Sequence, residues 1–163
     1  MDKLRTCFFT GHRRIAKEKI ETVKKKITEH IETLIIKYDV KNFISGGALG
    51  FDTLAAEMVI EMREKYPHIK LLMYLPCYGQ SKKWTSNYQY RYRLIISKAD
   101  EVKFVTKEEY TEDCMKLRNL EMIKDAFFCI SFCLVSSSGT GFTIRNAEAV
   151  GTKIINIADD IYD

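Results

Sequence analysis

Short apolar runs alternate along this chain with longer segments in which apolar residues recur every three or four positions. A short apolar run is typical of a buried strand, and the three-to-four spacing is typical of an amphipathic helix. We therefore predict strands over residues 4–10, 41–45, 69–75, 101–105, 127–135 and 152–157. We predict helices over residues 20–35, 52–65, 88–99, 113–125 and 143–150, between those strands.

This order of elements predicts the fold class. Strands that alternate with helices, and that are almost continuously apolar, form parallel sheets with helices on both faces. The chain shows no internal linker or low-complexity segment that would mark a domain boundary. We expect one α/β domain over residues 1–163, built on a single doubly wound, mostly parallel sheet.

Two glycine-rich segments each follow a predicted strand and precede a predicted helix. The first surrounds Gly46, Gly47 and Gly50, and the second runs over residues 136–143 around Gly139. Glycine lets the backbone approach a ligand closely, and a helix start presents unpaired N–H groups, so such a turn suits a phosphate. The hydroxyls in the second segment, including that of Ser138, can bind phosphate or cap the helix. The alternative is two ordinary connections with N-caps.

The topology of a parallel sheet predicts where these segments meet. Ligands of such sheets bind outside the carboxyl ends of the strands. The two glycine segments and the loop Thr10–Arg14 all leave strands at that edge. Arg13 and Arg14 would add positive charge there, although either could be a solvated surface residue.

Composition narrows the functional classes. The 163 residues are 46% hydrophobic and 29% charged, ordinary for a soluble globular protein, and the net charge is +4. That charge permits an anionic ligand but is small for a dedicated duplex-DNA binder. No apolar stretch approaches the ~18 residues of a membrane span, and the start lacks a secretory signal, so we expect a cytoplasmic protein without a membrane partner. The five cysteines and three histidines show no metal-ligand spacing, so no metal site is expected.

Four motifs in order resemble the SLOG superfamily. They are Thr-Gly-His-Arg at residues 10–13, Ser-Gly-Gly-Ala-Leu-Gly-Phe-Asp-Thr-Leu-Ala-Ala-Glu at 45–57, Arg-Asn at 118–119 and Gly-Thr-Gly-Phe-Thr at 139–143. This Rossmann-like group is named for the Smf/DprA DNA-processing proteins and the LOG phosphoribohydrolases. Within it the chain is most similar to small, single-domain, YpsA-like bacterial proteins. The resemblance covers nearly the whole chain.

The resemblance implies a Rossmann-like fold with a pocket for a nucleotide or nucleotide-derived ligand. The arginine of the Arg-Asn pair would reach the rim, where its fork could bind phosphate; an ion pair with Glu121 on the helix surface is the alternative. Matched by motif, the implied pocket residues are Gly11, His12, Arg13, Ser45, Gly46, Gly47, Gly50, Asp52, Arg118, Asn119, Gly139, Thr140 and Thr143.

Two departures limit what the resemblance implies. LOG enzymes have an acidic residue three positions after the Gly-Thr pair, where this chain has Thr143, and Glu148 lies further along the helix. A neutral hydroxyl cannot act as a general base, so hydrolysis is not favoured and no catalytic residue is assigned. DNA-processing relatives have additional domains, for which this chain has no spare length.

Two further residues have open roles. Asp52 begins a predicted helix, where a carboxylate can cap the helix or accept a hydrogen bond from a ribose hydroxyl. Trp84 lies in a segment that mixes aromatic side chains with Lys82 and Lys83, so it could stack on a nucleobase. Packing of Trp84 onto the sheet is the alternative.

The leading hypothesis is a sensor or regulatory protein that binds a small nucleotide ligand. The ligand would be of the NAD or ADP-ribose type or a nucleoside monophosphate, and no cofactor is required. The alternatives are a nucleotide N-glycosidic bond hydrolase and a single-stranded nucleic-acid binder, the latter not favoured by the modest charge. A homodimer is left open.

Overall fold

The computed structural model describes residues 1–162 and contains a six-stranded sheet. The strands are β1 (Thr6–Gly11), β2 (Asn42–Ser45), β3 (Lys70–Leu75), β4 (Glu101–Phe104), β5 (Phe128–Phe132) and β6 (Lys153–Asn156). Their order across the sheet is β4-β3-β2-β1-β5-β6, and every neighbouring pair is parallel. The predicted α/β, Rossmann-like fold class is confirmed.

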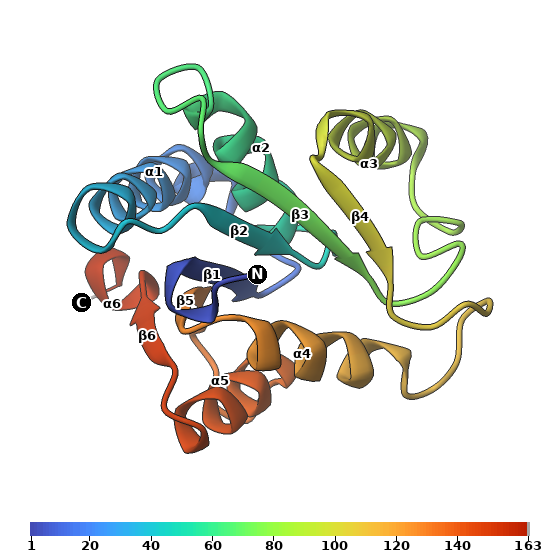
Figure 1. Ribbon diagram of the computed structural model, residues 1–163. Helices are drawn as coiled ribbons and strands as arrows, with labels where there is room; N and C mark the ends of the chain where they lie inside the picture. The colour runs from blue at the N-terminus through green and yellow to red at the C-terminus, as the bar shows by residue number, and fades with distance from the viewer. Residues whose placement is uncertain (163) are drawn as a thin grey trace.

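Helices cover both faces of this sheet. Figure 1 shows α1 (Ile20–Tyr38), α2 (Phe51–Met62) and α3 (Ser86–Lys98) on one side of it. The helices α4 (Cys114–Asp125) and α5 (Gly139–Ala149) lie on the other side. Short helical turns η1 (Lys3–Arg5), η2 (Lys17–Lys19) and α6 (Ala158–Ile161) complete the described elements, and none of these three was predicted from the sequence.

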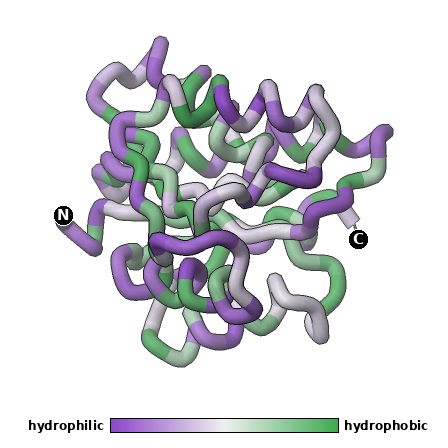
Figure 2. Tube along the Cα trace, turned by 90° about the vertical axis from the view of Figure 1, so that its right-hand side faces the viewer, coloured by the Kyte–Doolittle hydropathy of each residue, from purple (hydrophilic) through white to green (hydrophobic). Residues whose placement is uncertain are grey.

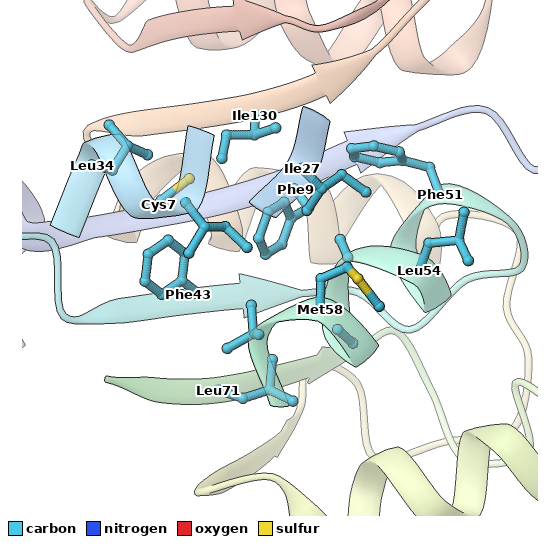
Figure 3. Close-up of a cluster of buried hydrophobic side chains, with 14 of the residues drawn as sticks. Cys7, Phe9, Ile27, Leu34, Phe43, Phe51, Leu54, Met58, Leu71 and Ile130 are labelled. Atoms are coloured by element: carbon cyan, nitrogen blue, oxygen red, sulfur yellow. The ribbon is translucent and has the colours of Figure 1, made fainter. Parts of the chain in front are cut away.

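The larger part of the core lies between the sheet and the α1–α2 face. The apolar positions of α1 that recur every three or four residues are buried, among them Val23, Ile27 and Ile31. Figure 3 shows side chains of α1 and α2 packed against β1, β2 and β5, with Phe9 stacked on Phe43 at 6.1 Å between ring centroids. In Figure 2, hydrophilic and hydrophobic stretches alternate along the outer helices, as expected for elements with one buried face.

Two boundaries around the second glycine segment differ from the sequence prediction. The strand β5 ends at Phe132 instead of residue 135, and the helix α5 begins at Gly139 instead of residue 143. The hydroxyl of Ser138 accepts a hydrogen bond from the N–H of Gly141, which starts the helix early. The four residues of β4, an edge strand of the sheet, are all exposed.

The strand order creates a switch point between β1 and β5. The chain moves outward from β1 through β2 and β3 to β4, then crosses back to place β5 on the other side of β1. Gly11 and Phe132 are register partners, so these two strands end at the same level. The loops that leave them diverge to opposite faces, which opens a crevice at the carboxyl edge. None of the helices in residues 1–162 combines the length and apolar character needed to cross a membrane.

Candidate functional site

A cavity of about 360 Å³ lies at this switch point. Three loops that follow strands contribute to its wall, together with the first turns of α2 and α5 and one face of α4. The lining residues are Thr10, Gly11, His12, Arg13, Ala48, Asp52, Met115, Arg118, Asn119, Ser138, Gly139, Thr140 and Thr143. The structure therefore brings together ten residues predicted from the sequence, in one cavity.

The first turn of α5 presents free amides to this cavity. The Ser138 hydroxyl accepts the N–H of Gly141 at 3.1 Å, and Phe142 donates its N–H to the Ser138 carbonyl. Within residues 1–162, no acceptor takes the N–H groups of Gly139 and Thr140. Both residues line the cavity. Two backbone donors at the positive end of a helix are therefore available for an anion.

The turn before α2 is different, because its amides at Gly47 and Ala48 already have partners. The Gly47 N–H donates to the Ser45 hydroxyl at 3.2 Å, and the Ala48 N–H donates to the Asp52 carboxylate at 3.3 Å. The Ser45 hydroxyl in turn donates to the Asp52 carbonyl. The Ser45 hydroxyl and the Asp52 carboxylate thus take two amides of the turn at which the sequence predicted a bound phosphate.

Asp52 is itself a feature of the cavity. Its side chain is 5% exposed, and only Oδ2 accepts a hydrogen bond from residues 1–162. Burial raises the pKa of Asp52 to about 6, while Arg118, the Ala48 N–H and Arg13 oppose that rise. The free oxygen Oδ1 can therefore accept a hydrogen bond from a hydroxyl group of a ligand.

Arg118 is buried behind the cavity and largely committed to the protein. Its Nη1 donates to the Gly46 carbonyl at 2.5 Å and its Nε to the Asn119 side chain at 2.8 Å. Its Nη2 meets only the Met115 sulfur, at 3.6 Å. Arg118 is 4% exposed as a whole residue, and its charge acts on Asp52 without a hydrogen bond between the two side chains. Arg118 thus keeps donor capacity at Nη2 for a ligand, and it forms no surface ion pair with Glu121.

The glycines of the first glycine-rich segment, Gly46, Gly47 and Gly50, allow close packing inside the protein. A β-carbon at Gly46 would overlap the Arg118 guanidinium, and one at Gly50 would overlap the Arg13 carbonyl. Gly47 and Gly50 also have φ values of 70° and 76°, which side chains rarely adopt. Ser45, Gly46, Gly47 and Gly50 therefore lie behind the cavity wall and do not line it.

The loop after β1 adds an imidazole and an exposed cation. His12 Nε2 accepts the Leu134 N–H at 2.7 Å, and burial lowers the pKa of His12. Both observations favour the neutral ring with its hydrogen on Nδ1. This contact also ties the loop after β1 to the loop after β5. Arg13 is exposed at the cavity mouth, where its charge acts on Asp52.

Asn119 and Thr143 connect α4 to α5 across the cavity. The Asn119 amide donates to the Thr143 hydroxyl at 3.1 Å, and that hydroxyl donates to the Gly139 carbonyl at 3.2 Å. Thr143 is thus engaged at both its donor and an acceptor position. These bonds hold the start of α5 against α4, and so fix the direction of its free amides.

Trp84 lies outside this cavity. Its ring packs edge-to-face on Tyr92, with the ring centroids 5.1 Å apart, and it lines a neighbouring cavity of about 490 Å³. The two cavities share Arg13, Ala48 and Met115. Sequence reasoning missed Thr10, Ala48 and Met115 as lining residues. Met115 lies one turn before Arg118 on α4, and that helical spacing was the available signal.

The arrangement can hold an anion next to a hydroxyl-bearing group. The free amides of α5, two arginines and a carboxylate with an open oxygen all line the same cavity, and both arginines act on that carboxylate. Among residues 1–162, Asp52 is the one carboxylate that lines the cavity, and Glu148 is exposed on α5 away from it. The described residues therefore present no pair of carboxylates.

Comparison with known proteins places this geometry in a family. The sequence model of the YspA SLOG family matches residues 8–130. The SPbeta prophage-derived protein YoqJ of Bacillus subtilis is 32% identical over 137 residues, which cover 77% of this chain and 80% of YoqJ.

A UPF0398 protein of Bacillus cereus strain B4264 is 33% identical over 101 residues, 61% of this chain and 54% of that protein. The chain thus spans about half the length of the UPF0398 relatives it matches. Among solved structures, DNA processing protein A from Helicobacter pylori, described for its binding of single-stranded DNA, has a TM-score of 0.65 at 18% identity. That alignment covers 93% of this chain and 64% of the other, and it supports the shared fold.

Proposed function

Because this chain belongs to the YspA SLOG family, we propose that its switch-point cavity binds a nucleotide or nucleotide-derived ligand and that the protein acts as a sensor or regulator. The protein would report the presence of the ligand instead of transforming it. The proposal depends on what the cavity offers to each part of such a ligand.

One observation supports the proposal most strongly. The unpaired amides of Gly139 and Thr140 open into the same cavity as the buried Arg118, whose Nη2 has no oxygen acceptor among residues 1–162. A phosphate at this position would receive two backbone hydrogen bonds and one from the guanidinium. Hydrogen bonds to a charged partner are the stronger kind.

Asp52 suits the sugar next to that phosphate. Its open Oδ1 can accept a ribose hydroxyl, as acidic residues do in dinucleotide sites. Because the pKa of Asp52 is about 6, the side chain is mostly ionised at neutral pH and repels phosphate from its end of the cavity. The two ends of the cavity therefore suit different parts of the ligand, with the phosphate at α5 and the sugar toward α2.

The choice of a sensor over a catalyst rests on the groups near this sugar. Thr143 stands where the LOG enzymes have an acid, and its hydroxyl is already bonded to Asn119 and to the Gly139 carbonyl. Asp52 stands without a second carboxylate among the described lining residues. Binding is thus supported by more groups than acid–base chemistry is.

Calorimetric titration of the purified protein tests the proposal. AMP, ribose 5-phosphate, NAD and ADP-ribose are compared with adenosine and ribose, which lack the phosphate. We expect at least one phosphate-bearing compound to bind, and its uncharged counterpart to bind at least tenfold more weakly, as expected for lost charge-assisted hydrogen bonds. Absence of any heat at millimolar ligand, with the protein folded by circular dichroism, would refute the proposal.

A second candidate function, cleavage of a nucleotide N-glycosidic bond, has one observation in its favour. The raised pKa of Asp52 is suited to a carboxyl that gives or takes a proton near neutral pH. Incubation with AMP and ADP-ribose, followed by chromatography for free adenine and the ribose phosphate that remains, tests this function. Release of base by the wild type but not by Asp52→Asn would support it, and no release by either would exclude it for these substrates.

A further inference from the structure

A second cavity adjoins the first and has a different character. It has a volume of about 510 Å³ and lies between α4 and α5, and we call it the α4–α5 groove. Met115, Leu120, Ile123 and Phe142 give it apolar walls, while Lys116, Ser137 and Asn146 lie at its polar rim. Leu120 and Phe142 are 52% and 47% exposed, so both helices present apolar side chains to an open space. Such exposure on facing helices is typical of a binding surface.

The groove and the switch-point cavity share the start of α5. Ser138, Gly139 and Thr143 line both spaces, as do Met115 and Asn119 on α4. The free amide of Gly139 therefore lies at the junction of the two, and that of Thr140 follows it on the side of the switch-point cavity. A phosphate bound there would have open space on both sides, toward Asp52 in one direction and toward Phe142 in the other.

The walls of the groove fit a flat aromatic group. The Phe142 ring is 47% exposed and supplies a stacking surface, with Lys116 Nζ over the ring at 5.6 Å from its centre as a cation–π partner. Asn146 donates its amide hydrogen to the Phe142 carbonyl at 2.8 Å, which leaves its side-chain oxygen open as an acceptor. The Ser137 hydroxyl makes no hydrogen bond within residues 1–162. Apolar walls with polar groups at the edge are what a nucleobase requires.

The neighbouring Trp84 cavity fits a base less well. Its walls include the charged side chains of Arg13, Lys82, Lys83 and Glu109, and the Trp84 ring is already packed on Tyr92. Of the two spaces next to the switch-point cavity, the α4–α5 groove is therefore the better seat for an uncharged aromatic ring.

We propose that the α4–α5 groove is the base subsite of this site, and that the ligand is a diphosphate esterified at both ends, with a nucleobase on Phe142 and a sugar on Asp52. This inference rests on the proposed function, and it names the ligand class. A terminal phosphate monoester would fill only one of the two connected spaces. A diphosphate with a group on each side fills both and keeps its charge at the free amides of α5.

Calorimetric titration with ADP-ribose and ribose 5-phosphate tests the proposal in wild-type protein and in Phe142→Ala. Because Phe142 is half-exposed, its truncation should leave the fold intact. We expect Phe142→Ala to weaken ADP-ribose binding roughly tenfold or more, as for a lost stacking contact, and to leave ribose 5-phosphate within about twofold. Tyr90→Ala, which removes an exposed aromatic ring on α3 outside these cavities, is the matched control and should change neither affinity.

Each contrary outcome identifies what failed. Equal affinity of ADP-ribose for the wild type and Phe142→Ala, or a loss caused by Trp84→Ala instead, would overturn the base subsite. Ribose 5-phosphate binding as tightly as ADP-ribose would overturn the diphosphate class. An oligothymidylate that displaces ADP-ribose, and whose own binding is weakened by Phe142→Ala, would also overturn that class. Failure of both small ligands to bind the wild type would refute the proposed function itself.

Discussion

The guanidinium of Arg118 occupies the space in which a side chain at Gly46 would lie, and it donates a hydrogen bond to the carbonyl of that same residue. The two residues are 72 positions apart in the sequence. Through this contact, the glycine that follows β2 fixes a cation from α4 behind the cavity. Gly46 therefore supports the site without lining it.

The first prediction follows from this contact. Gly46→Ala places a methyl group against the guanidinium, so Arg118 must leave its bonds to the carbonyls of Gly46 and Tyr74. We expect the free energy of unfolding to fall by roughly 1–3 kcal/mol, the usual cost of overpacking a buried position. Urea denaturation followed by circular dichroism measures it.

Gly139→Ala provides the control for this substitution. A β-carbon at Gly139 meets no atom within 4 Å, so we expect a change of no more than about 0.5 kcal/mol. Because Gly→Ala restricts the unfolded chain and by itself favours folding, equal losses for the two variants would show that the Arg118 contact does not set the effect at Gly46.

The second prediction concerns pH. Burial raises the pKa of Asp52 from 3.8 in its ordinary state to about 6, so the folded protein binds this proton more tightly than the unfolded chain does. The stability linked to this group is therefore fully present below about pH 4 and is lost as the pH rises through 6. Across the whole window the loss amounts to roughly 3 kcal/mol at most, since one pKa unit corresponds to about 1.4 kcal/mol.

Urea denaturation of the wild type and of Asp52→Asn, at pH 4.5 and pH 7.5, isolates this group from the other titrating side chains. We expect the wild type to lose more stability than the variant between the two pH values, because asparagine has no proton to release. Parallel changes in the two proteins would contradict the raised pKa of Asp52.

The third prediction separates the structural role of Trp84 from binding. Because its ring packs edge-to-face on Tyr92, we expect Trp84→Ala to lower the free energy of unfolding by roughly 1–2 kcal/mol. We expect the affinity for ADP-ribose to stay within about twofold, since Trp84 does not line the switch-point cavity or the α4–α5 groove. A tenfold loss of affinity without loss of stability would instead assign base stacking to Trp84.

The alternation of strands and helices was predictable because each element has its own hydrophobic period. The convergence of three loops at one edge was also predictable, since parallel strands place their carboxyl ends together. Gly11, Asp52 and Gly139 therefore line one cavity although they are far apart in the sequence.

The difference between the two glycine segments was not predictable. Whether a helix start has free amides depends on side chains that fold back onto it. In the turn before α2, the Ser45 hydroxyl and the Asp52 carboxylate take the N–H groups of Gly47 and Ala48. At α5 the Ser138 hydroxyl takes only that of Gly141. The Arg118 side chain likewise points into the protein because it contacts Gly46, the residue after β2, and no local sequence pattern encodes that contact.

The fourth prediction tests the free amide of Gly139 directly. Gly139 is the first residue of α5, a position at which proline is favoured, and Ser138 before it has the extended conformation that precedes proline (φ −74°, ψ 171°). Gly139→Pro therefore removes one N–H from the cavity and should leave the helix intact. Loss of one hydrogen bond to a phosphate should weaken ADP-ribose binding roughly tenfold or more.

Gly139→Ala is the control, because it keeps the N–H and adds a β-carbon in open space, so this variant should bind ADP-ribose more tightly than the proline variant does. If both substitutions reduce affinity equally, the effect is steric and the amide is not a ligand; if neither does, the phosphate lies elsewhere in the cavity.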